Sequence, residues 1–186
     1  MLDSFILAGG QSKRFGKDKL LYKLNGKRMI DYTLKNAYTF SNRVYMVVKE
    51  TQKFSDIRCD GLIVDVIPEQ ASIVGLLTSL LKSASMDRFV LSGDMPFVDR
   101  EITNILLSEH SYFYTVFSVE GKIYPFPGIY NQCITGDLCL YIKEGGRSIR
   151  RFLKSIPGKI IEIDPTLKLL NINSPSDITI FQGLKI

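Results

Sequence analysis

The chain has 186 residues, of which 45% are hydrophobic and 23% charged, and its formal net charge is +5. This length and composition indicate a globular domain with a sizeable core and exclude a disordered chain. No apolar run approaches the ~20 residues that a membrane-spanning helix needs. The opening residues also lack a secretory leader, so we expect a cytoplasmic protein without membrane contacts.

The first half of the chain alternates apolar, β-branched runs with segments of helical periodicity. Strands are predicted at Asp3–Ala8, Arg43–Val48, Leu62–Ile67 and Arg88–Leu91, and helices at Met29–Phe40 and Ser72–Ser85. Strands that alternate with helices predict parallel βαβ units. Near-continuous hydrophobic strands are typical of a sheet that helices cover on both faces.

The second half has a different pattern. Two apolar runs flank Glu120-Gly121 and predict an antiparallel hairpin from Ser111–Val119 and Lys122–Ile129. Further segments predict helices at Asn131–Lys143 and Ser148–Leu153, short strands at Lys159–Ile163 and Lys168–Ile172, and a final helix opening at Ser174. The sequence therefore predicts an α/β fold with three α/β/α layers of Rossmann-like type, a mostly parallel central sheet and a small antiparallel extension.

A glycine-rich loop directly follows the first predicted strand. It begins Leu7-Ala8-Gly9-Gly10 and continues to Lys19, with four basic residues from Lys13 to Lys19. Glycines let backbone N–H groups approach an anion, and Arg14 and Lys19 add a planar fork and a point charge for phosphate oxygens. The spacing fits neither a P-loop nor the dinucleotide fingerprint. We interpret the loop as a phosphate-binding turn.

The segment Leu7-Ala8-Gly9-Gly10-x-Ser12-x-Arg14-x-Gly16-x-Asp18-Lys19 resembles the signature loop of the GT-A-like nucleotidyltransferases. It is most similar to that of the molybdenum cofactor guanylyltransferases. The resemblance implies a single nucleotidyltransferase domain over residues 1–186, with a nucleotide-binding half (1–98) and an acceptor-binding half (99–186). It also implies that Leu7, Ala8, Gly9, Gly10 and Lys19 contact the nucleotide, with Arg14 and Lys19 in catalytic roles.

Asp94 ends the fourth predicted strand, within Gly93-Asp94-Met95-Pro96. Ligands of open α/β sheets bind at the carboxyl ends of strands, and Mg²⁺ prefers oxygen ligands together with substrate phosphates. The segment resembles the metal-binding segment of the same family. We therefore expect Asp94 to be catalytic, to contact the nucleotide and to hold Mg²⁺, for which Mn²⁺ could substitute.

Asp65 closes the third predicted strand, and its carboxylate could accept hydrogen bonds from guanine. An acidic residue in the family precedes a Gly-Pro-Leu-x-Gly segment by five residues, and here Ala71-Ser72-Ile73-Val74-Gly75 follows instead. Glu69 is the alternative reader of the base in another register.

The acceptor half contains two polar segments that resemble family motifs. Arg147 and Ser148 lie in a Gly-x-Arg-Ser segment, and Asn171 and Asn173 precede Ser174-Pro175. Asparagines at i and i+2 share one face of an extended chain. We expect these four residues to bind a phosphorylated acceptor, with Ser148 capping a helix.

Alternative chemistries have weaker support in the sequence. The cations cluster at Lys13–Lys19 and Arg147–Lys154 rather than in one patch with interleaved aromatics, so we expect no nucleic acid partner. Three cysteines without a C-x-x-C pair and a single histidine, His110, predict neither a zinc site nor a disulfide framework.

The resemblance implies transfer of GMP from GTP to the phosphate of molybdenum-molybdopterin, with release of pyrophosphate. A related enzyme could use CTP or another nucleotide with molybdopterin, cobinamide phosphate or a sugar phosphate. A non-catalytic nucleotide-binding protein would have lacked Asp94 or Lys19. Transient contacts with proteins that deliver or receive the cofactor are also expected.

Overall fold

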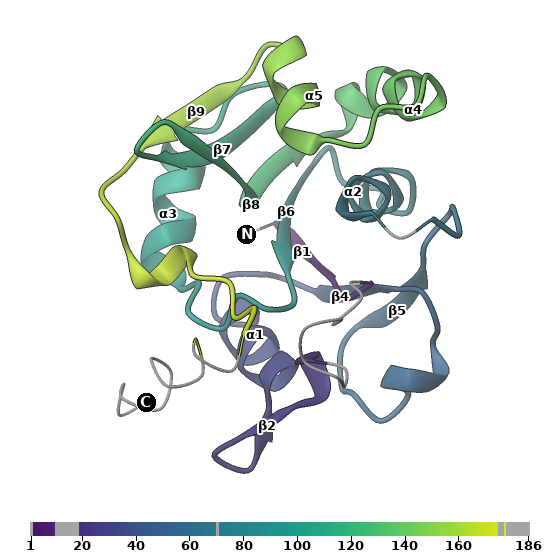
Figure 1. Ribbon diagram of the computed structural model, residues 1–186, viewed down its shortest axis with the longest axis vertical. Helices are drawn as coiled ribbons and strands as arrows, with labels where there is room; N and C mark the ends of the chain where they lie inside the picture. The colour runs from purple at the N-terminus through teal and green to yellow at the C-terminus, as the bar shows by residue number, and fades with distance from the viewer. Residues whose placement is uncertain (1, 10–18, 70, 175–176, 178–186) are drawn as a thin grey trace.

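A seven-stranded sheet forms the centre of the computed structural model, which describes residues 2–9, 19–69, 71–174 and 177 (Figure 1). In sheet order the strands are β5 (Gly61–Val64), β4 (Val44–Val48), β1 (Asp3–Leu7), β6 (Asp87–Ser92), β8 (Lys122–Asn131), β7 (Tyr114–Val119) and β9 (Lys159–Glu162). β8 is antiparallel to both of its neighbours, and every other pairing in the sheet is parallel. The predicted mostly parallel sheet with a small antiparallel extension is confirmed.

Helices cover both faces of this sheet (Figure 1). One face carries α1 (Met29–Ala37) and α3 (Arg100–Ser108), and the other carries α2 (Ser72–Leu81), α4 (Thr135–Lys143) and α5 (Ile149–Ser155). The alternation of side chains along β1 supplies both cores: Ile6 packs with the α1/α3 cluster, and Phe5 with the α2/α4/α5 cluster. The predicted three-layer arrangement is confirmed.

Smaller elements complete the described chain. A two-stranded ribbon, β2 (Lys23–Leu24) and β3 (Lys27–Arg28), lies before α1. Short 3₁₀ turns are found at Lys19–Leu21, Gln52–Phe54, Gln132–Ile134 and Leu167–Leu169. No helix among the described residues is long and apolar enough to cross a membrane.

The strand order places a crevice beside β1. The chain runs from β1 to β4 and β5 on one side, then returns through α2 to β6 on the other. Such a reversal of direction opens a ligand-binding crevice at the carboxyl ends of the strands. Gly9 and Asp94 follow β1 and β6 at this point.

The hairpin of β7 and β8 contains a wide bulge. Val116 pairs with Gly128, but the next residue, Phe117, pairs with Tyr124. Three residues of β8, from Pro125 to Pro127, therefore have no counterpart on β7. Proline cannot donate a ladder hydrogen bond, which explains why the extra residues are found here.

One predicted strand is wrong. Lys168–Ile172 was expected to extend the sheet, but residues 167–169 form a 3₁₀ turn and the following residues are unpaired with any strand. The Thr166 hydroxyl accepts a hydrogen bond from the Lys168 amide at 3.2 Å, which favours the turn. The Ile172 amide instead donates to the carbonyl of Asp94 at 2.9 Å. We call residues 165–174 the C-terminal strap.

Other element bounds shifted by a few residues. β5 ends at Val64: the Asp65 amide still donates to the Val48 carbonyl at 2.9 Å, but the Val66 amide leaves the sheet and donates to the Thr78 hydroxyl at 3.1 Å. The helix expected from Asn131 begins at Thr135, since Asn131 still belongs to β8 and its side chain accepts from the Cys133 amide. The final helix expected from Ser174 lies outside the described residues, apart from Asp177.

Asp99 connects the C-terminal strap to α3, because its carboxylate interacts with both. Its carboxylate accepts from the Ile102 amide as the N-cap and pairs with Lys168 of the strap at 2.9 Å. Partial burial acts to raise the pKa of Asp99, but the hydrogen bonds from Lys168 and Ile102 outweigh it and lower the pKa overall.

Replacing Asp99 by alanine should therefore reduce stability in a pH-dependent way. At pH 7 we expect the variant to lose about 1 kcal/mol of unfolding free energy, the usual value of an N-cap. A lowered pKa contributes stability above the pKa of the unfolded chain, and this contribution is lost as the pH falls through the folded pKa. Urea unfolding of both proteins at pH 7 and near pH 3 tests this; an unchanged difference at the lower pH would contradict it.

Candidate active site

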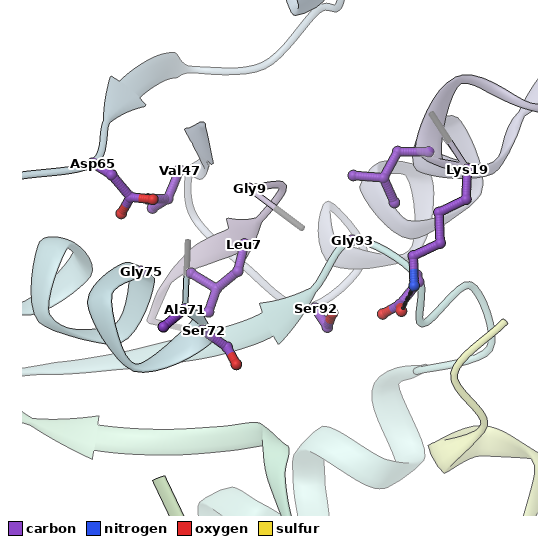
Figure 2. A pocket seen from close by; sticks show the side chains of 12 residues that line it. Leu7, Gly9, Lys19, Val47, Asp65, Ala71, Ser72, Gly75, Ser92 and Gly93 are labelled. Atoms are coloured by element: carbon purple, nitrogen blue, oxygen red, sulfur yellow. Dashed lines mark hydrogen bonds and ion pairs between the residues drawn. The ribbon is translucent and has the colours of Figure 1, made fainter. Parts of the chain in front are cut away.

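A first cavity of about 520 Å³ lies at the carboxyl ends of β1, β4, β5 and β6 (Figure 2). It is lined by Leu7, Gly9, Lys19, Leu20, Val47, Asp65, Ala71, Ser72, Gly75, Ser92, Gly93 and Asp94. This size is in the range that binds a small organic ligand. The sequence-predicted residues Leu7, Gly9, Lys19, Asp65 and Asp94 all line it. Ala8 is buried just before Gly9, whereas Gly10 and Arg14 lie outside the described residues.

Figure 2 shows Asp65 and Lys19 at opposite ends of the first cavity. Gly75 of α2 packs against Leu7 at the floor, where an added Cβ would lie 3.1 Å from a Leu7 methyl group. Since Ala71 and Ser72 also line the cavity, the N-terminus of α2 faces it, and the first amides of a helix lack partners within the helix. This end of α2 therefore offers backbone donors to an anion.

The Asp94 side chain is the centre of a polar cluster at the other end. Its carboxylate accepts from the Lys19 ammonium and from the Asn171 amide, the latter at 2.8 Å. Lys19 also donates to the Asn173 side-chain oxygen at 2.9 Å. Asp94 and Lys19 expose only 7% and 16% of their side chains, so the ion pair is largely shielded from water. We call these four residues the junction cluster.

A second cavity of about 680 Å³ adjoins the first, since both are lined by Ser72 and Ser92. Its walls come from the β8 bulge, the start of α5 and the C-terminal strap. They comprise Val119, Lys122, Tyr124, Pro125, Phe126, Arg147, Ser148, Ile149, Arg150, Pro165, Thr166, Leu169, Leu170, Asn171 and Asn173. The four residues predicted to bind the acceptor all lie in this wall.

Cations and aromatic rings occur together in the second cavity. The Lys122 ammonium lies 5.3 Å from the centre of the Tyr124 ring. Arg150 is held by a hydrogen bond of 2.7 Å from its Nε to the Ile123 carbonyl. A wall with three cations and two aromatic rings suits a flat, negatively charged ligand.

Arg147 and Ser148 have local partners as well. Arg147 pairs with Glu69 at 2.5 Å and donates to the Ile142 carbonyl at 3.0 Å. Ser148 caps α5 as predicted, accepting from the Arg151 amide.

Glu69, the alternative base reader, is 43% exposed, pairs with Arg147 and does not line the first cavity. Of these two candidate base readers, Asp65 is the one that lines the cavity.

Sequence reasoning missed Lys49, which pairs with Asp65 at 3.0 Å. Lys49 directly follows β4 as Asp65 follows β5, but this spacing becomes a signal only once the two strands are known to be neighbours. Sequence reasoning also missed Ser72 and Ser92, shared by the two cavities, and the bulge residues of β8. Ser72 stands in the Ala71–Gly75 segment and Ser92 directly before Gly93-Asp94, but the sequence assigned neither of them a role.

Asp94 contributes one carboxylate to the lining of the first cavity, beside Lys19. Among the described residues no three histidine, cysteine, aspartate or glutamate side chains cluster in a way that would enclose a metal. This donor set suits Mg²⁺, which is commonly held by one or two carboxylates together with substrate phosphates and water.

The fold and the two adjoining cavities suit a protein that brings two small ligands together, and comparison with known proteins gives its class. The model of the MobA-like NTP transferase domain matches residues 4–159. The chain belongs to this family and is a nucleotidyltransferase. The resemblance of its glycine-rich loop to the molybdenum cofactor guanylyltransferases is thereby confirmed.

Individual relatives extend over nearly the whole chain. A protein of Aquifex aeolicus strain VF5, named "Probable molybdenum cofactor guanylyltransferase", is 35% identical over 176 residues, covering 94% of this chain and 87% of the relative. A crystal structure of an Aquifex aeolicus VF5 protein has a TM-score of 0.80 at 33% identity, with 94% of each chain covered. Molybdopterin-guanine dinucleotide biosynthesis protein A of Archaeoglobus fulgidus shares the fold, with a TM-score of 0.81, 21% identity and 98% of each chain covered.

Proposed function

We propose that this protein acts in molybdenum cofactor biosynthesis and transfers GMP from GTP to the phosphate of molybdenum-bound molybdopterin, releasing pyrophosphate. The observation that carries this proposal is the junction cluster. Asp94 and Lys19 line the first cavity, Asn171 and Asn173 line the second, and hydrogen bonds join them. A reaction between two ligands, one in each cavity, would take place at this boundary.

The nucleotide fits the first cavity in one orientation. Its phosphates belong at the end with Lys19 and Asp94, because the Lys19 ammonium there offsets negative charge. The N-terminus of α2 offers further backbone donors between this end and Asp65. Its base belongs at the Asp65 end, where a carboxylate can accept hydrogen bonds from N1–H and the exocyclic amine of guanine. The name of the 35% identical relative supports guanine.

The acceptor fits the second cavity. Lys122, Arg147 and Arg150 suit its phosphate, and Tyr124 and Phe126 suit a flat ring such as a pterin. Residues 99–186 contribute most of this wall, which supports their assignment as the acceptor half. A protein that passes such a cofactor on would make transient contacts with donor and recipient proteins.

The chemistry follows from this placement. An acceptor phosphate oxygen attacks the α-phosphorus of GTP in line, the new P–O bond forms, and the bond to pyrophosphate breaks. Phosphate oxygens are already ionised at pH 7, so no strong general base is needed. Lys19 offsets charge on the phosphates, while Asn171 holds the Asp94 carboxylate in place and Asn173 orients Lys19. Mg²⁺ or Mn²⁺ on Asp94 would neutralise charge on the nucleotide phosphates.

Nucleotide binding tests the base assignment. At about 100 times its dissociation constant a ligand stabilises the folded state by about 2.7 kcal/mol. For a chain of this length that raises the melting temperature by about 5–10 °C. We expect GTP with Mg²⁺ to produce this shift, and ATP and CTP to produce clearly smaller ones. Equal shifts for all three would refute guanine selectivity and favour a related enzyme that uses CTP or another nucleotide.

Pyrophosphate release tests the acceptor. Each nucleotide is combined in turn with molybdopterin, cobinamide phosphate and a sugar phosphate. We expect release only with GTP and molybdopterin. Release with a sugar phosphate alone would replace the proposed acceptor, and binding without any release would indicate a non-catalytic nucleotide-binding protein.

A further inference from the structure

Lys49 has all of its hydrogen-bonding capacity committed within the protein. Its ammonium contacts the Asp65 carboxylate at 3.0 Å, the Ile67 carbonyl at 2.8 Å and the Glu69 carbonyl at 2.5 Å. A lysine ammonium has three N–H donors, so each is used. Lys49 exposes 17% of its side chain and is not among the residues lining the first cavity. It acts on other residues rather than on a ligand.

Asp65 is held at both of its oxygens. Oδ1 accepts from the hydroxyl of Thr78, a fully buried residue of α2, at 2.8 Å, and Oδ2 pairs with Lys49. The carboxylate is 4% exposed, yet it lines the first cavity. Each carboxylate oxygen can accept two hydrogen bonds, so each keeps acceptor capacity for a ligand.

Gly9 lies directly against this ion pair. A Cβ on Gly9 would be 3.3 Å from Asp65 Oδ2 and 3.5 Å from Lys49 Cγ. The start of the glycine-rich loop therefore packs on the pair, at the end of the cavity opposite Lys19 (Figure 2). The pair belongs to the base end of the site, not to the phosphate end.

We propose that Lys49 is a positioning residue that sets base selectivity by fixing Asp65 as an oriented, charge-compensated carboxylate. Without Lys49, a largely buried carboxylate would have no compensating charge and would rotate toward water, which removes acceptors from the cavity. This inference rests on the proposed function, since it assigns a role in reading guanine.

The experiment compares the binding of GTP and inosine triphosphate, whose base lacks only the exocyclic amine of guanine. Titration calorimetry without acceptor measures binding independently of turnover. A hydrogen bond to a charged acceptor is worth about 1.5–3 kcal/mol, so the wild-type protein should prefer GTP by about 10- to 100-fold. Lys49→Met should reduce this preference to about threefold or less, mainly by weakening GTP. Lys82→Met, at an exposed lysine of the α2 C-terminus, should leave it unchanged.

Two further variants separate positioning from folding. Asp65→Asn should lose the same preference, and combining it with Lys49→Met should cause no further loss, because the two residues act as a unit. If Lys49→Met does not fold, Lys49→Gln replaces it, since the amide can still donate to the turn carbonyls without a charge.

The outcomes are distinct. If the wild-type protein prefers GTP and Lys49→Met retains that preference, the inference about Lys49 is overturned and the proposed function stands. Equal weakening of both nucleotides would mean a purely structural role and would also overturn it. If the wild-type protein itself does not distinguish the two nucleotides, both the inference and the proposed guanine selectivity fail.

Discussion

Asp94→Asn should reduce nucleotidyl transfer by about three orders of magnitude while the protein still folds. The substitution keeps the shape of the side chain but removes the charge that would hold a divalent cation. Cation catalysis contributes several kcal/mol to such reactions, and each 1.36 kcal/mol corresponds to a tenfold change in rate. The new amide also presents a donor to Lys19 or to Asn171, each of which already donates to Asp94.

The measurement is pyrophosphate release at saturating GTP, acceptor and Mg²⁺, with circular dichroism to confirm folding. Asp137→Asn is the matched control, because Asp137 is exposed in the first turn of α4. We expect the control to keep wild-type activity. A residual rate of Asp94→Asn within tenfold of the wild type would exclude Asp94 from the metal-binding role.

Most of the central sheet could be predicted from the sequence because its strands are buried on both faces. Near-continuous runs such as Phe5-Ile6-Leu7 have no polar face, so they fit a parallel sheet between helices better than a surface strand. The position of Asp94 at the end of such a run then placed it at the edge where ligands bind. Family resemblance supplied Asn171 and Asn173, which the structure joins to Asp94 and Lys19.

Other features depend on contacts between residues distant in the chain. Lys168–Ile172 of the strap was predicted as a strand from its apolar residues. Instead, Lys168 pairs with Asp99 and Glu101 at the start of α3, and the Ile172 amide donates to the Asp94 carbonyl. These partners decide the conformation, and strand propensity does not contain them. The pairing of Lys49 with Asp65 likewise requires knowledge that β4 and β5 are neighbours with aligned ends.

Lys19→Met should reduce turnover by about 10²- to 10³-fold and, more diagnostically, should make the stability of the free protein depend on Mg²⁺. The turnover estimate is that for the loss of one preorganised electrostatic contact to the transition state. In the wild-type protein the Lys19 ammonium pairs with the Asp94 carboxylate and donates to the Asn173 side-chain oxygen. A metal cation must therefore compete with Lys19 for Asp94. Removing one partner of a buried ion pair costs about 3–5 kcal/mol, because a charge remains without compensation.

Thermal unfolding without nucleotide measures this dependence. Without Mg²⁺, the variant should melt about 10 °C below the wild type, which is the shift in melting temperature that this loss of unfolding free energy causes in a chain of this length. Millimolar Mg²⁺ should recover a large part of that loss, whereas it should shift the wild type little. The double variant Lys19→Met with Asp94→Asn should be insensitive to Mg²⁺, since it lacks both charges.

The comparison decides whether Lys19 occupies the position that a cation would take. If Mg²⁺ raises the melting temperature of the wild type and of Lys19→Met equally, Lys19 does not compete for Asp94. If only Lys19→Met responds, the ion pair holds the carboxylate in place until nucleotide phosphates draw the ammonium away. Since Asn173 accepts from the same ammonium and lines the second cavity, its side-chain oxygen would then become available to the acceptor once the nucleotide is bound.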